Sequence, residues 1–158
     1  MTPEQYKQHI RNLKAESYQK LIEKWKSDPE GHEQHKKKMR ESAQEYRNNH
    51  PHRAWAKSTL YHHKLRKGLT VNITLDELEE YAKAVTECIY CGAHLDFTPR
   101  VTNSGFRSKG PSLDRKDNND VLSLDNIQII CGECNAIKGK WTEEYFLAKI
   151  RKIATKNP

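Results

Sequence analysis

The stretch that decides the fold begins at Cys88-Ile89-Tyr90-Cys91-Gly92 and ends at Cys131-Gly132-Glu133-Cys134-Asn135. The chain holds four cysteines, all in these two pairs, which lie about 40 residues apart. A Cys-x-x-Cys pair turns two thiols toward one point, and two such pairs supply the four soft ligands that tetrahedral Zn²⁺ prefers. We therefore expect a structural zinc ion held by Cys88, Cys91, Cys131 and Cys134. The alternative is two disulfides in a secreted protein.

Composition limits the size of the hydrophobic core. Only 35% of the 158 residues are hydrophobic, which is low for a globular domain, so a small core needs a metal or another cross-link. The chain opens with Met1-Thr2-Pro3-Glu4, and it holds no apolar stretch of the length that a bilayer requires. We expect no membrane partner and a reducing, cytoplasmic location, where paired cysteines bind metal.

Charge divides the chain into two parts. Residues 1–70 hold 16 Lys and Arg against 8 Asp and Glu, whereas residues 71–158 hold 12 against 13. The net charge of +7 therefore comes from the first part, which also holds seven of the eight histidines. This asymmetry predicts a basic, helical, nucleic-acid-binding arm at 1–70 and a nearly neutral module at 71–158.

The candidate partner of the arm is DNA, expected to be double-stranded. Residues 29–49 are polar nearly all round, and such a helix lies on a partner, bridges solvent or is unstable alone. A solvated charged helix without a partner is the alternative. The candidate DNA contacts are Lys36, Lys37, Lys38, Arg40, Arg47, Arg53, Lys57, Lys64, Arg66 and Lys67.

Capping and breaking residues predict where the helices of the arm begin and end. Thr2-Pro3-Glu4-Gln5 predicts a first helix with a capping box, and Asp28-Pro29 and His50-Pro51 predict breaks. A further helix is expected over 52–67, with Gly68 as its C-terminal cap.

The module combines short strands with helices, so the expected fold class is α+β. Thr74-Leu75-Asp76-Glu77 predicts a capping box ahead of an amphipathic helix. A loop rich in Gly and Ser is expected over 98–111. Beyond it we expect strands at 112–115 and 127–130, a helix near Asn135 and a last helix after Trp141.

Four segments of the module match the motif pattern of a known family: Cys88 to Gly92, Ser112 to Asn118, Asp125 to Cys131, and Cys134 to Lys138. Over roughly residues 70–150 the chain resembles the HNH endonucleases, also called ββα-metal or His-Me finger nucleases. It resembles in particular the phage sub-type with four zinc cysteines. The resemblance implies a zinc-stapled nuclease module that hydrolyses DNA phosphodiester bonds, encoded by a phage or a mobile element.

The resemblance also implies roles for single residues. In the family, a hairpin and a helix hold one divalent ion, Mg²⁺ or Mn²⁺, beside the scissile phosphate. The matching ligands here are Asp114 and Asn135, both hard oxygen donors. Asn126 matches the residue that buttresses the hairpin by bonding backbone, and Lys138 matches a contact to the phosphate or to the developing charge.

One residue departs from the family pattern. The position after the ligand Asp normally carries the His that deprotonates the attacking water, and here it is Arg115. An Arg guanidinium stays protonated, so its natural role is a phosphate clamp. Three explanations stay open. Asp117, a substrate oxygen or a metal-activated water acts as the base; a histidine of the arm such as His62 or His63 reaches the site; or the protein binds DNA without cutting it.

If the protein binds DNA without cutting it, functions other than a nuclease have to be considered. A non-catalytic zinc DNA-binding protein has no need of two Mg²⁺-type ligands, so the pair Asp114 and Asn135 favours the nuclease. RNA binding or cleavage also fits, because phosphate contacts carry no base information. Homing, nicking during packaging and degradation of host DNA fit equally well, and the sequence predicts no oligomeric state.

Overall fold

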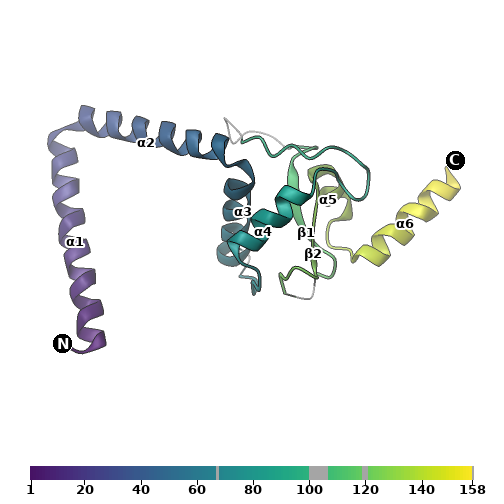
Figure 1. Ribbon diagram of the computed structural model, residues 1–158, viewed down its shortest axis with the longest axis horizontal. Coiled ribbons are helices and arrows are strands. Elements are labelled where there is room, and N and C mark those ends of the chain that lie inside the picture. Colours follow the sequence, from purple (N-terminus) through teal and green to yellow (C-terminus); the bar gives the residue numbers. More distant parts are fainter. Residues whose placement is uncertain (67, 100–106, 119–120, 158) are drawn as a thin grey trace. The chain divides into compact units, whose positions relative to one another are not determined.

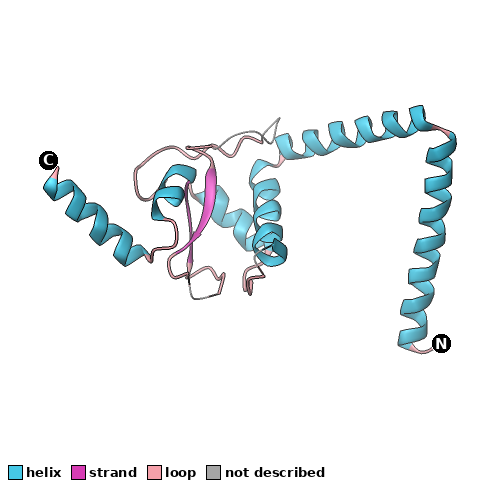
Figure 2. Ribbon diagram, turned by 180° about the vertical axis from the view of Figure 1, so that it is seen from behind, coloured by secondary structure: helices cyan, strands magenta, loops and turns pink. Residues whose placement is uncertain are grey.

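The computed structural model describes residues 1–66, 68–99, 107–118 and 121–157, without the side chain of Arg66. These residues form six α-helices, one π-helical turn and one two-stranded antiparallel sheet (Figures 1 and 2). The expected α+β class is therefore confirmed. The chain divides into two compact units, Met1–Glu45 and Tyr46–Pro158. Every helix within the described residues is too short or too polar to cross a membrane.

The first unit consists of helix without a core. Helix α1 covers Pro3–Ser27, and α2 covers Pro29–Asn49, which runs past the end of the unit. The expected capping box forms, because Thr2 Oγ1 accepts from Gln5 N and Gln5 Oε1 accepts from Thr2 N. The expected break at Asp28 is also present. Neither helix buries a residue, so these helices depend on local backbone bonds, caps and exposed contacts.

The second unit begins with a helix that changes its pitch. Helix α3 covers Pro51–Tyr61, and the π-helical turn η1 covers His62–Arg66, where sequence patterns predicted one continuous helix. Gly68 follows with a φ of +64°, a backbone conformation that glycine adopts without strain. The predicted break before Pro51 is confirmed.

Helix α4 (Leu75–Ala84) packs against α3 (Figure 1). Its predicted capping box at Thr74 forms. Arg53 of α3 joins the two helices, because its Nη1 lies 2.8 Å from Asp76 Oδ1 and 2.5 Å from Glu79 Oε2. Ala56 of α3 is fully buried in the core, so α3 is an integral part of this unit.

Strands β1 (Pro111–Arg115) and β2 (Ile127–Cys131) form the sheet at the two predicted positions. The register places Leu113 opposite Ile129 and Asp114 opposite Gln128. Every residue of β2 is buried, and its isoleucines join the buried face of α4 in one hydrophobic core. The loop expected over 98–111 includes residues 100–106, which lie outside the described part of the chain.

Two helices follow the sheet. Helix α5 (Gly132–Lys138) begins earlier than predicted, because Cys131 Sγ caps it by accepting from Cys134 N at 3.4 Å. It packs against both strands. Helix α6 (Glu143–Lys156) begins after the capping residue Thr142.

The observed division of the chain differs from the expected boundary after residue 70. Residues 46–70 belong to the second unit, since Ala56 is buried in its core and Trp55 Nε1 donates to Pro111 O at 3.1 Å. Residues 1–45 hold ten basic and eight acidic side chains, whereas 46–70 hold six basic and none acidic. Most of the positive excess therefore lies within the second unit.

Candidate functional site

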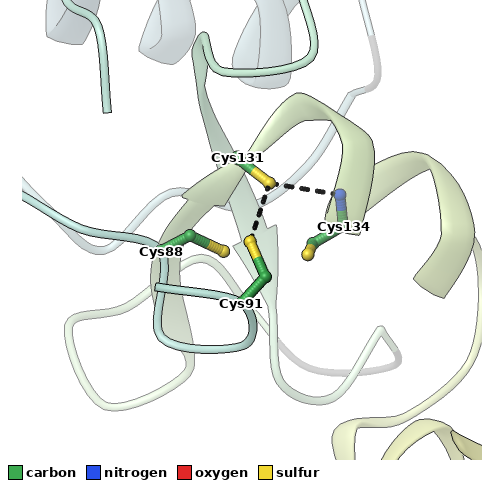
Figure 3. Close-up of side chains that lie close together, drawn as sticks. All are labelled: Cys88, Cys91, Cys131 and Cys134. Atoms are coloured by element: carbon green, nitrogen blue, oxygen red, sulfur yellow. Dashed lines mark hydrogen bonds between the residues drawn. The ribbon is translucent and has the colours of Figure 1, made fainter. Parts of the chain in front are cut away.

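The four cysteines meet at one point (Figure 3). Their Sγ atoms all lie within 4.8 Å of one another, and Cys91 Sγ is 3.7 Å from Cys131 Sγ. A tetrahedral zinc ion with Zn–S bonds of about 2.3 Å separates its sulfurs by about 3.8 Å. The predicted ligand cluster is therefore confirmed, and it can hold a metal ion such as zinc.

Each cysteine pair lies on a tight turn. In the first pair, Gly92 N donates to Cys88 O and Cys88 N donates to Ala93 O, both at 2.8 Å. Gly92 has a φ of +69°, which makes this turn possible. The second pair lies where β2 ends and α5 begins, so a metal ion would tie the first loop to the junction of strand and helix.

Burial and hydrogen bonding act in opposite directions on the thiols. Burial disfavours the Cys88 thiolate, but hydrogen bonds to the backbone of Cys131, Tyr90 and Cys91 outweigh it and lower the pKa of Cys88 to about 7. Burial raises the pKa of Cys131 and of Cys134. One thiol of the cluster therefore ionises readily, and a bound cation would ionise the others with release of protons.

Asp114 lies in a buried network next to this cluster. The residue is 5% exposed, and its carboxylate Oδ1 lies 3.0 Å from Lys138 Nζ and Oδ2 2.9 Å from Gln128 Nε2. Lys138 is fully buried and also donates to Arg115 O at 2.9 Å. A buried ion pair of this kind is sensitive to the loss of either partner, since the remaining charge is left uncompensated.

Lys138 is buried, whereas the resemblance implied a contact with the phosphate or with the developing charge. A contact with phosphate needs an exposed ammonium group, but its side chain is 0% exposed and bonds Asp114. The physical reason is its position on α5, which packs directly on β1. In this structure Lys138 is the counter-charge of Asp114.

Two members of the network around Asp114, Gln128 and Tyr90, were not predicted from the sequence. Gln128 donates to Tyr90 Oη as well as to Asp114, and Tyr90 Oη donates to Glu143 Oε1 of α6 at 3.2 Å. Burial raises the pKa of Tyr90, which keeps its hydroxyl protonated and able to donate. The signals available were a polar residue inside the apolar run Ile127–Ile130 and a tyrosine between two cysteines that were predicted to bind zinc.

Asn126 fastens the turn between the strands. Its Oδ1 accepts from Asp117 N at 2.9 Å, and its Nδ2 donates to Asp117 O and Val121 O at 2.9 and 3.0 Å. These three partners are all backbone groups, as expected of the buttress that the resemblance implied. Its importance for catalysis stays a prediction.

Asn135 faces β1 from α5. Its Nδ2 donates to Ser112 Oγ at 2.7 Å. Ser112 and Asp114 are two residues apart on a strand, and Asn135 and Lys138 are three apart on a helix, so each pair shares one face. The bonds Ser112–Asn135 and Asp114–Lys138 thus lie side by side between β1 and α5. Ser112 was not among the predicted site residues.

The predicted DNA contacts are spread over both units. Lys36, Lys37, Lys38 and Arg40 lie on the first unit, where Lys36 Nζ pairs with Glu33 Oε1 at 2.6 Å. Arg47, Lys57 and Lys64 are exposed on the second unit. Arg53 is held in its two ion pairs instead, and the Arg66 side chain and Lys67 lie outside the described residues.

Comparisons with models of protein families, with curated proteins and with solved structures found no match to this chain.

Proposed function

We propose that this protein is a metal-dependent endonuclease of the HNH type, which hydrolyses phosphodiester bonds in double-stranded DNA. The observation that carries the proposal is the packing of α5 on β1, which sets Asp114 and Asn135 on facing elements beside the four-cysteine cluster. Hard oxygen donors next to a metal-clamped hairpin suit phosphodiester hydrolysis.

The four-cysteine cluster has a structural role in this proposal. Four thiolates would fill the coordination sphere of a zinc ion and leave no position for substrate. The ion would join the loop at Cys88 to the β2–α5 junction. It would thereby hold α5 against β1 and keep Asp114 and Asn135 in place.

The oxygen atoms around Asp114 are of the kind that a catalytic Mg²⁺ or Mn²⁺ ion binds. The two bonds to Lys138 and Gln128 use two of about four lone-pair sites on the Asp114 carboxylate. Gln128 Oε1 is a buried oxygen that lacks a hydrogen-bond partner among the described residues. Asp114 and Asn135 would hold the ion, which would polarise the phosphate and stabilise the leaving oxygen.

The surrounding residues would position the reacting groups. Lys138 orients the Asp114 carboxylate through its bond to Oδ1, and Asn126 fastens the turn that joins the two strands. Arg115 follows Asp114 on β1 and would clamp a phosphate through its guanidinium fork. Arg115 does not act as a base, because its guanidinium stays protonated.

One observation favours a second function. The charge of Asp114 is already balanced by Lys138 at 3.0 Å. A protein that only docks its zinc-clamped hairpin and helix on DNA needs no further cation there. The alternative is therefore a zinc-containing DNA-binding protein with little or no nuclease activity.

The test is nicking of supercoiled plasmid by the zinc-loaded protein with Mg²⁺ or Mn²⁺. We expect Asn135→Ala to reduce nicking at least about 100-fold, the scale on which one group that stabilises transition-state charge acts. DNA affinity should be retained. Asn135→Ala is preferred to Asp114→Ala, because the latter leaves Lys138 buried without its partner.

The matched control is Asn12→Ala, which changes an exposed asparagine of α1. It should nick like the wild type. Tight binding without nicking under all metal conditions favours the DNA-binding alternative. Parallel loss of binding and nicking in Asn135→Ala contradicts the catalytic assignment.

A further inference from the structure

A pocket of about 400 Å³ lies beside Asn135 in the second unit. One wall comes from α3 and η1, and the other comes from β1 and from Asn135 of α5. Three apolar residues, Trp55, Pro111 and Leu113, contribute to the walls. The polar side chains that line it are Ser58, Thr59, His62, His63, Ser112 and Asn135.

The polar lining has the chemistry of an anion site. Hydroxyl, imidazole and amide groups all donate hydrogen bonds, and no carboxylate is among the described residues that line the pocket. A phosphate oxygen accepts such bonds, and the described lining holds no acidic side chain that would repel it. The pocket therefore suits a phosphate group.

The charge around the pocket favours the same ligand. The wall formed by α3 and η1 belongs to residues 46–70, which hold six basic and no acidic side chains. Lys57 and Lys64 are exposed on this segment. A positive segment beside a concave site raises the local concentration of a polyanion such as DNA.

The two walls are held together by specific contacts. Trp55 Nε1 donates to Pro111 O at 3.1 Å, which ties α3 to the first residue of β1. Leu69 N donates to His63 O at 3.2 Å and closes the turn after η1. The π-helical turn that carries both histidines is a rare form of helix that occurs often at functional sites.

The two histidines differ in exposure. His63 is 8% exposed, whereas His62 is exposed to solvent while it lines the pocket. A general base has to meet both the water and the substrate, which His62 can do. Arg115 cannot take the proton, so another group has to act as the base, and His62 lines the pocket that also holds Asn135.

We propose that this pocket receives the scissile phosphate of the nucleic acid, and that His62 is the general base; this inference rests on the proposed endonuclease function. One ring nitrogen of neutral His62 accepts a proton from water as the water oxygen bonds to phosphorus. The bond from phosphorus to the 3′ oxygen breaks, and the leaving oxygen gains a proton from solvent. The products carry a 5′ phosphate and a 3′ hydroxyl.

Chemical rescue tests the role of His62. We expect His62→Ala to lower plasmid nicking about 10²- to 10⁴-fold, the usual contribution of a general base, while DNA affinity is retained. Added imidazole should restore part of the rate in this variant. His94→Ala removes an exposed histidine away from the pocket and should leave nicking unchanged.

Wild-type nicking by His62→Ala overturns the assignment of the base and leaves the proposed endonuclease intact. Absence of nicking in the wild type overturns the endonuclease and, with it, the base. A loss in His62→Ala that imidazole does not restore overturns the proton-transfer role and assigns His62 to structure.

The phosphate site is tested without cleavage by NMR of histidine side chains in the full-length protein. Inorganic phosphate is the probe, at constant pH and ionic strength, with chloride as the control anion. We expect saturable shifts of the His62 and His63 ring signals and none for His94. Equal or absent shifts at all three histidines overturn the phosphate site, whether or not the wild type nicks DNA.

Discussion

The two units of this protein hold their structure in different ways. In Met1–Glu45 the helices bury no residue, and ten basic side chains are offset by eight acidic ones. In Tyr46–Pro158 short elements pack around a small core and a buried ion pair, beside a four-cysteine cluster that can hold a metal ion. Charge counts alone joined residues 46–70 to the first unit, but burial assigns them to the second. Basic residues can therefore belong to the walls of a site rather than to a separate arm.

Loss of the metal site should have the largest effect and should separate the two units. We expect Cys134→Ser to unfold the second unit, because structural zinc sites contribute about 10–16 kcal/mol, more than the net stability of most domains. The helices of the first unit should keep their signals, since they bury nothing there. Amide NMR spectra measure both outcomes in one sample.

The same separation should follow when a chelator removes zinc from the wild type, and added zinc should reverse it. A Cys134→Ser variant whose second unit stays folded without zinc contradicts the structural role of the cluster. Loss of the first-unit signals at the same time would contradict the independence of the two units.

The buried ion pair should rank second. Lys138→Met removes the counter-charge of Asp114, whose buried carboxylate would keep its hydrogen bond from Gln128 but lose its ion pair. We expect the free energy of unfolding to fall by about 3–5 kcal/mol, as measured for other broken buried pairs. Urea denaturation of the zinc-loaded protein measures the loss, with Lys140→Met, an exposed neighbour, as the matched control.

The double variant Lys138→Met with Asp114→Asn should recover much of the lost stability, because it leaves no uncompensated charge. If the single variant is as stable as Lys140→Met, the ion pair does not stabilise the second unit. It would then no longer distinguish the second unit from the first.

DNA binding should show a smaller effect that decides which unit carries the electrostatic contact. We expect Lys57→Glu with Lys64→Glu to weaken binding at least about tenfold and to reduce the salt slope by about 2, since each phosphate contact contributes about 0.9. Lys37→Glu with Lys38→Glu makes the same change in charge on α2. Affinity measured across salt concentrations compares the two pairs.

A larger effect from the α2 pair would restore the first expectation, in which the helices before residue 50 lie on DNA. Equal effects would mean that both units contact the phosphates. Either result identifies which basic residues contact DNA, because the exposure of a side chain does not by itself identify such a contact.

Local signals predicted the ends of helices well. Capping boxes and helix breaks depend on residues close together in the chain, so the sequence predicts them. This holds for the capping boxes at Thr2 and Thr74 and for the breaks before Pro29 and Pro51. The four-cysteine cluster was predicted for a similar reason, because the spacing within each pair sets the direction of its thiols.

Contacts distant in sequence escaped prediction. Gln128 reaches Asp114 because of strand register, and Lys138 reaches it because α5 packs on β1. Trp55 is 56 residues from its partner Pro111, so nothing local places α3 in the second unit. The pocket with His62 depends on the same packing, and this explains why the histidines of residues 46–70 looked remote from Asn135.

The smallest predicted effect concerns the ion pair between α3 and α4. Hydrogen bonding to Arg53, then to Lys83, lowers the pKa of Glu79 below its ordinary value of about 4.3. Its stabilising effect is therefore fully present above that ordinary value and is lost as the pH falls through the lower, folded-state pKa. We expect Glu79→Gln to lower the melting temperature of the second unit by no more than about 3 °C at pH 7. The difference from wild type should vanish in acid.

The matched change in the first unit is Glu33→Gln, since hydrogen bonding to Lys36 also lowers the pKa of Glu33. No core depends on that pair, so Glu33→Gln should leave the cooperative transition unchanged. A shift of equal size in both variants would mean that the helices of the first unit melt together with the core of the second.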